Sequence, residues 1–213
     1  MNLNDALQLI ATFSNSSSNS FNHQAAQDAM VKKSATVISD TLRSETVIRG
    51  TNQVLPSELA DYIDCICAES NLIFDSVGHP VELLKTTDLA FKPTLYAGLT
   101  GELGKWQNDW FLIAHEGGDP IIVKTSQQGE SSPVYSAMQG MGFWDFAPIA
   151  DSIGQFLVCI SAIQYALNFP GLQQPLDEDF NLAPAAANWL FPFLRQHAGA
   201  HYDEWASVFE NYI

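Results

Sequence analysis

The chain has 213 residues and is 46% hydrophobic, which is enough for the packed core of one domain with helical additions. Nine lysine and arginine residues stand against 24 aspartate and glutamate residues, so the formal net charge is -15. A surface this acidic repels phosphate groups, which argues against direct nucleic-acid binding and favours a basic protein partner.

The acidic excess is largest in residues 125–213, which carry nine acids and a single base, Arg195. Charge that only keeps the protein in solution would also account for this excess. The N-terminus, MNLNDALQLIATF, has an acid where a signal peptide needs bases, and no apolar run reaches the roughly 18 residues of a membrane span. We therefore expect a soluble, cytoplasmic protein with no membrane partner.

The cysteines and histidines do not form a metal-binding pattern. Cys65, Cys67 and Cys159 are odd in number, and their spacing does not match a structural zinc site. We expect reduced thiols in the core. The chain also lacks a nucleophile elbow, a Walker loop and a dinucleotide-binding fingerprint, so we expect no cofactor, no metal and no catalytic residues.

Residues 1–50 are predicted to be an N-terminal helical extension. Asn4 is a plausible N-cap for a first helix that carries Leu7 and Ile10, and the SNSSSNS stretch at 14–20 then forms a loop. A second helix with an imperfect apolar stripe is predicted over residues 23–42.

Residues 51–168 are predicted to be an α+β core. A helix follows Leu55 and Pro56, with Ser57 as its candidate cap. Short apolar runs separated by turn residues then predict an antiparallel sheet. These runs lie at 81–85, 93–99, 110–115, 120–125 and 132–138.

The clearest helix is predicted over residues 153–167, with Asp151 as its cap. The side opposite its apolar stripe is polar and uncharged, which is unusual for a solvated surface, so we expect another element to cover it.

Residues 169–213 are predicted to be a C-terminal helical extension that packs on the core. Pro192 is expected to start or kink a helix, and Tyr202, Trp205, Phe209 and Tyr212 share one side of another. Burying these aromatic side chains against the 153–167 helix keeps them from water. A homodimer interface would do the same, so both a monomer and a homodimer stay open.

The stretch WFLIAHEGGDPIIVKT places a histidine and two acids around a glycine pair, between two apolar runs. We predict a hairpin with residues 116–119 as a four-residue connection, because glycine allows the positive φ angles of a tight reversal. A zinc helix would need His-Glu-x-x-His, and the fifth position here is Asp119. A hydrolase whose active site is centred on His115 and Glu116 is the other hypothesis for this stretch.

Three tryptophans, Trp106, Trp110 and Trp144, surround this hairpin in the sequence. They could line a ligand pocket, but aromatic residues of a sheet protein more often belong to its core. We expect them in the core.

The order of the segments resembles the SUKH superfamily, which includes fungal cell-wall assembly regulators and bacterial toxin-immunity proteins. The resemblance covers roughly residues 55–163. It rests on Leu55, Pro56, Gly117, Gly118, Asp119, Pro133, Val134, Ala150, Ser152, Phe156 and Leu157.

This resemblance implies an α+β fold, with a mostly antiparallel, curved sheet flanked by helices, and this chain adds extra N- and C-terminal helices. Immunity proteins of the family neutralise a toxin, frequently a nuclease, by binding it without chemistry of their own. We therefore expect a non-enzymatic protein-binding module that neutralises a basic cognate toxin through its acidic surface. A regulatory protein that binds a small molecule or a peptide is the alternative.

Five residues are the candidate partner contacts. Glu116 and Asp119 lie at the predicted hairpin tip, Glu130 lies in the next loop, and Trp144 and Asp145 lie in the glycine-containing GMGFWDF stretch. An aromatic residue beside an acid can anchor a basic partner. The other interpretation of each is a solvated turn acid or a core tryptophan.

Overall fold

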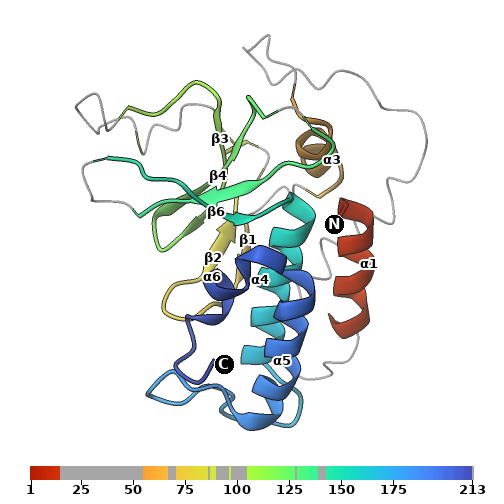
Figure 1. Ribbon diagram of the computed structural model, residues 1–213, viewed down its shortest axis with the longest axis vertical. Coiled ribbons are helices and arrows are strands. Elements are labelled where there is room, and N and C mark those ends of the chain that lie inside the picture. The colour runs from red at the N-terminus through yellow and green to blue at the C-terminus, as the bar shows by residue number, and fades with distance from the viewer. Residues whose placement is uncertain are drawn as a thin grey trace.

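The computed structural model describes residues 1–14, 55–66, 71–85, 87–89, 96, 105–127, 129–138 and 143–212 (Figure 1). The predicted helix at 23–42 and Cys67 lie outside the described residues. So does the predicted strand at 93–99, apart from Tyr96.

Within the described residues, six strands form one antiparallel sheet in which each strand pairs with its neighbour in sequence. They are β1 (Leu72–Phe74), β2 (Val81–Leu83), β3 (Trp110–Glu116), β4 (Asp119–Lys124), β5 (Val134–Ser136) and β6 (Ala147–Ala150). The predicted α+β class with a mostly antiparallel, curved sheet is confirmed. The sequence prediction missed β1 and β6, and β6 contains Pro148, a residue that disfavours a strand.

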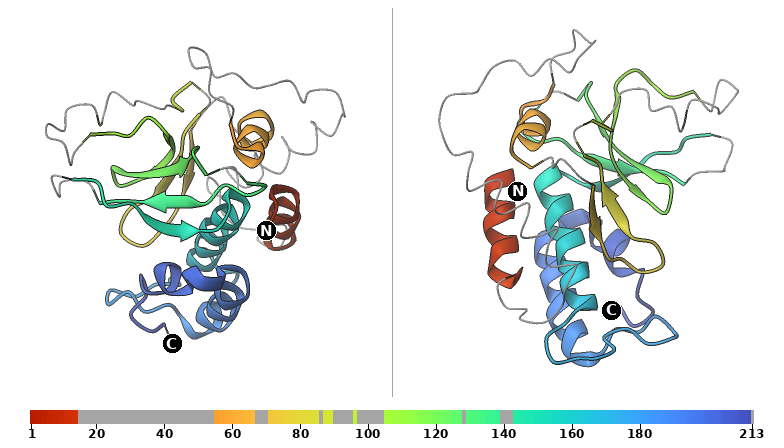
Figure 2. Two further views of the ribbon diagram at one scale, coloured as in Figure 1. Left: turned by 45° about the horizontal axis from the view of Figure 1, so that its top comes forward. Right: turned by 180° about the vertical axis from the view of Figure 1, so that it is seen from behind.

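The described helices pack beneath one face of this sheet and around one another (Figures 1 and 2). They are α1 (Leu3–Ser14), α3 (Ser57–Cys65), α4 (Ile153–Leu167), α5 (Pro184–His197), the 3-10 turn η2 (Gly199–His201) and α6 (Tyr202–Ala206). Both α1 and α5 lie against α4, which is buried along nearly its whole length. The uncharged side of α4 is therefore covered, as its sequence indicates.

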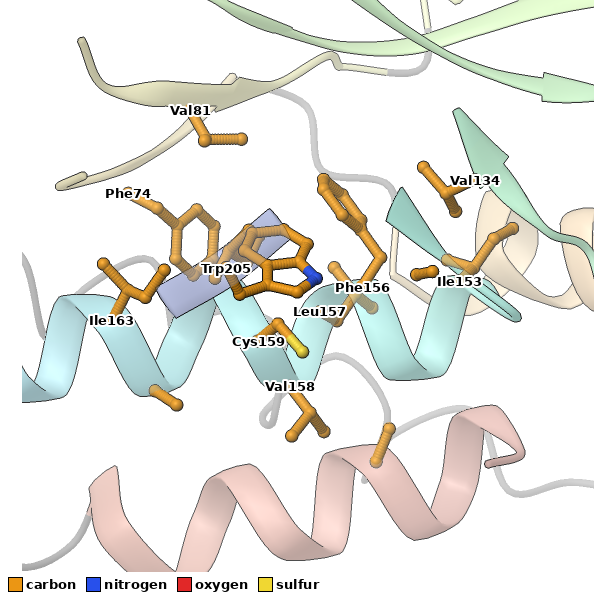
Figure 3. Close-up of a cluster of buried hydrophobic side chains, with 14 of the residues drawn as sticks. Phe74, Val81, Val134, Ile153, Phe156, Leu157, Val158, Cys159, Ile163 and Trp205 are labelled. Atoms are coloured by element: carbon orange, nitrogen blue, oxygen red, sulfur yellow. The ribbon is translucent and has the colours of Figure 1, made fainter. Parts of the chain in front are cut away.

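One hydrophobic core holds residues from all three predicted segments. It includes Ile10 of α1, Phe156 of α4, Leu190 of α5 and Phe209 near the C-terminus. Figure 3 shows Phe156 and Ile163 on the side of α4 that faces the sheet, and Val158 on the side that faces α1. The buried thiol of Cys159 belongs to the same core.

The aromatic residues of the C-terminal segment pack on this framework. The ring of Trp189 in α5 lies 4.6 Å from that of Tyr165 in α4 and 5.6 Å from that of Phe13 in α1, between ring centroids. The ring of Trp205 in α6 lies 5.9 Å from that of Phe156. These contacts bury much of the aromatic area of the segment within a single chain, whereas Phe180 and Tyr212 stay exposed.

Three predicted helix caps are wrong. The cap of α1 is Asn2 rather than Asn4, and the cap of α4 is Ser152 rather than Asp151. In both cases the side-chain oxygen of the residue that precedes the first helical turn accepts the amide three residues on. Ser57 is already the first residue of α3 and makes no capping bond.

Two predictions for the C-terminal segment also need correction. Pro192 does not start a helix but lies inside α5, next to the buried Phe191 and close to the buried Leu194. Tertiary packing therefore outweighs the amide that proline cannot donate. The helix predicted from Tyr202 to Tyr212 ends at Ala206, so Phe209 and Tyr212 lie in a turn.

The buried carboxylate of Glu58 joins three separate elements. Its side chain reaches from α3, is 5% exposed, and accepts the amide of Ser132 at 2.6 Å and that of Gly154 at 3.0 Å. The second of these amides belongs to the first turn of α4, whose free N–H groups need acceptors. Burial raises the pKa of Glu58, and the amides of Gly154 and Ser132 oppose that shift.

The start of α1 docks at the same end of α4. Ser152 donates its hydroxyl to the carbonyl of Met1 at 2.8 Å. A Cβ atom on Gly154 would lie 2.9 Å from the carbonyl oxygen of Asn2, closer than such atoms approach. Only glycine at this position lets the two helix ends meet.

Replacing Glu58 should destabilise the protein strongly. Glu58→Ala leaves two buried N–H groups without an acceptor, so we expect the free energy of unfolding to fall by about 3 kcal/mol. Glu58→Gln keeps one carbonyl oxygen and should retain part of that free energy. Urea unfolding of both variants measures the effect, with the exposed Glu130→Gln as the control. A Glu58→Ala protein as stable as the control would show that this carboxylate does not hold the three elements together.

Candidate functional site

The hairpin between β3 and β4 is tighter than the sequence indicates. Glu116 and Asp119 are paired strand residues, so the connection has two residues rather than four. Gly117 and Gly118 have φ angles of 57° and 105°, which glycine adopts without steric cost. The imidazole of His79 packs over Gly117, where an added Cβ atom would lie 2.6 Å from it.

A β-bulge in β3 decides which side chains face the helices. The register shifts between Leu112 and Ala114, so Ile113 and Ala114 both belong to the core on the helix side of the sheet, while Leu112 lies on the other face. Beyond the bulge, His115 therefore points to the outer face and Glu116 to the helix side. No residue type or spacing in the sequence of β3 indicates this shift of register.

His115 and Glu116 consequently lie on opposite faces of the sheet. The Nδ1 atom of His115 lies 2.7 Å from the hydroxyl of Tyr96, and that hydroxyl donates to the carbonyl of Gly118 at 2.8 Å. Burial lowers the pKa of His115. The two residues of the minor hydrolase hypothesis cannot act on one substrate.

A groove of about 410 Å³ opens between the hairpin end of the sheet and the helices. The wall of the groove on the sheet side is lined by residues that pair across neighbouring strands: Val81 pairs with Glu116, and Ile121 pairs with Ser136. Buried side chains form its floor, and Figure 3 shows several of them, with Trp205 lying between α4 and the sheet. These floor residues are Val81, Ile121, Phe156, Ile163 and Trp205.

Acidic side chains and one methionine surround the mouth of the groove. Asp145 and Glu204 are exposed, and Glu116 is half-buried. The side chain of Met138 is 68% exposed, which is unusual for so apolar a residue. No lysine, arginine or histidine occurs among the described residues that line the groove. The groove thus combines an apolar floor with a rim whose charged side chains, within the described part of the chain, are all acidic.

The surroundings of Glu116 disfavour its charge. Burial is the largest cause that raises the pKa of this carboxyl, and the negative charge of Asp119 adds to it. The hydroxyl of Ser76, which donates to Glu116 Oε1 at 3.5 Å, and nearby His79 act in the opposite direction. A cation that entered the groove would remove this penalty on the carboxylate.

The structure brings together two of the five candidate contact residues. Glu116 and Asp145 line the same groove, because the chain returns after β5 to the hairpin end of the sheet, where the amide of Ala137 donates to Pro120. Asp119 lies opposite Glu116 in the pairing but does not line the groove.

The other two candidates lie elsewhere. Glu130 is exposed in the loop between β4 and β5, at the opposite end of the sheet. Trp144 is 9% exposed and belongs to a second hydrophobic cluster on the outer face. The ring of Trp106 lies 5.9 Å from that of Trp144 and 5.6 Å from that of Trp110, so the tryptophans pack on one another. Trp144 is buried as predicted, whereas Trp106 and Trp110 are only partly buried against this cluster.

Sequence reasoning missed Glu204 and Met138 as parts of the site and assigned Trp205 only to packing. All three come from segments distant from the hairpin in sequence. The indole Nε1 of Trp205 donates to the carbonyl of Ile149 at 2.8 Å, which ties α6 to the edge strand β6 and closes one side of the groove.

A second hollow of about 390 Å³ lies on the outer face, lined by Ile73, Pro80, Glu82, His115, Gly117 and Gly118. It carries a single carboxylate and lies beside Tyr96, whose neighbours in sequence are not described. Within the described residues, no three histidine, cysteine or acidic side chains are placed to hold a metal ion. The acidic groove is therefore the stronger candidate.

The raised pKa of Glu116 predicts a pH-dependent effect of Glu116→Gln. A carboxyl group with a raised pKa binds its proton more tightly in the folded protein than in the unfolded chain. Its contribution to the stability of the fold is therefore complete below the ordinary glutamate pKa and is lost as the pH rises through the pKa of the folded protein. Relative to the wild type, Glu116→Gln should become more stable as pH rises through this window. Urea unfolding across that range measures the difference.

A difference between the two proteins that is constant with pH would contradict the assigned surroundings of Glu116. Asp119→Asn supplies a second check, because removing the neighbouring charge should make the pH dependence smaller.

None of the described helices has the length and apolar character needed to cross a bilayer. Comparisons with protein-family models, curated proteins and solved structures find no match to this chain. The resemblance to the SUKH superfamily therefore stays a prediction from the sequence motifs.

Proposed function

We propose that this protein is a non-enzymatic protein-binding module that acts as an immunity protein, and that its acidic groove binds and neutralises a basic toxin in the cytoplasm. The observation that supports this most is the rim of Glu116, Asp145 and Glu204 around an apolar floor, without a basic side chain among the described lining residues. The sequence resemblance to toxin-immunity proteins points the same way.

The charge of the whole chain favours such a partner. A toxin that cleaves nucleic acid presents lysine and arginine residues around its active site, and a protein with a net charge of -15 competes for them. Long-range attraction speeds the encounter, while the apolar floor supplies contacts that slow dissociation. The inhibitor would then cover the cleft that otherwise receives phosphate groups.

The proposal predicts that charge reversal in the groove slows association with the toxin. Asp145→Lys and Glu204→Lys change exposed residues at the mouth, so the fold should persist. We expect the association rate of the double variant to fall on the order of tenfold at low salt, and its salt dependence to become weaker. Stopped-flow measurements with the purified product of any basic toxin gene found beside this one, and growth of cells that express both genes, provide the readouts.

Glu130→Lys combined with Asp179→Lys is the matched control, because it makes the same change of charge at exposed sites outside the groove. An equal effect of this control would mean that net charge, and not the groove, sets the rate. Failure of the wild-type protein to protect cells from that toxin would refute the immunity function.

A further inference from the structure

The size of the groove restricts its occupant. Small-molecule sites span about 300–1,000 Å³, so 410 Å³ accommodates one or two side chains and not a whole element of a partner protein. A partner that covers this face would therefore insert a short segment. The chemistry of the lining then indicates which side chains that segment carries.

The floor and the rim require different properties of one occupant. Aliphatic and aromatic carbons of Ile121, Phe156 and Trp205 form the floor, whereas carboxylates of Asp145 and Glu204 lie at the exposed mouth. A purely apolar side chain would leave the carboxylates without a counter-charge. An anion would be repelled by three acids, and a bare metal ion would meet an apolar floor.

We infer that the groove receives an arginine side chain flanked by apolar residues of the partner, an assignment that rests on the groove being the partner-binding site proposed above. The methylene stem lies along Ile149 and Met138, and the guanidinium group meets the carboxylates at the mouth. Arginine fits better than lysine, because its planar group donates several hydrogen bonds at once and is more weakly hydrated. The flexible thioether of Met138 can adapt to the flanking residues.

Glu116 supports this assignment from inside the groove. Its carboxyl is half-buried, and no cationic side chain occurs among the described lining residues. The nearby Asp119 is also an acid, and among the residues that the structure describes His79 is the basic side chain that acts on Glu116. A guanidinium group would supply the positive charge that this cluster lacks.

A pair of peptides that differ in one charge tests the inference. The probes are acetyl-Gly-Leu-Arg-Leu-Gly-amide and the same peptide with citrulline, which keeps the shape of arginine but is uncharged. The indole N–H of Trp205 serves as the reporter in nitrogen-proton NMR spectra, because it is bonded to Ile149 in the groove. A Trp205→Phe variant assigns its signal.

The arginine peptide should shift the Trp205 signal and bind on the order of tenfold more tightly than the citrulline peptide. Asp145→Asn with Glu204→Gln should remove most of that difference, whereas Glu130→Gln should leave it unchanged. Equal binding of both peptides, no binding of the arginine peptide, or shifts confined to residues outside the groove would each overturn the inference.

These outcomes separate this inference from the proposed function. If the peptides fail but the Asp145→Lys and Glu204→Lys variant still loses protection against the toxin, the groove binds its partner through other chemistry. If the arginine peptide binds but the protein protects against no toxin, the arginine site stands and the immunity function falls.

Discussion

The two hydrogen bonds that Glu58 accepts fix where α4 begins beneath the sheet. One carboxylate joins α3 to the segment before β5 and to the first turn of α4, and Gly154 lets the start of α1 dock beside it. From that point α4 runs beneath the sheet, with Phe156 in its first turn and Ile163 further along, and both side chains line the groove. The floor of the groove thus depends on an ionisable group that holds the start of this helix.

Which side chains of β3 line the groove depends in turn on the bulge in this strand. If the side chains of β3 alternated regularly through Ile113, His115 would lie on the helix side and Glu116 on the outer face. The bulge instead puts the histidine beside Tyr96 and the acid above the apolar floor. Strand alternation keeps these two neighbours on opposite faces in either case, and the bulge decides which of them lines the groove.

Local patterns predicted the α+β class and the bounds of α4, because a buried helix of this length has a strong apolar period. The helix caps and the edge strands β1 and β6 were missed. Glu58, which accepts the amide of Gly154 at the start of α4, lies 96 positions earlier in the chain, so no local pattern reveals it. Strand β6 contains Pro148, which does not fit the sequence pattern of a strand. Among the residues of the site, Glu116 and Asp145 could be recognised in the sequence as acids near turns. Only folding brings them to the same groove as Glu204.

The groove is the place where acidic and apolar side chains of this acidic protein converge at the surface. Hydrogen exchange of backbone amides, measured with and without a toxin against which the protein protects cells, tests most directly whether a partner binds there. Binding in the groove should slow exchange in β6 and α6, which border it, and leave the residues around Glu130 unchanged. Protection centred on Glu130 or on the outer face, with β6 and α6 unaffected, would contradict the assignment of the groove as the binding site.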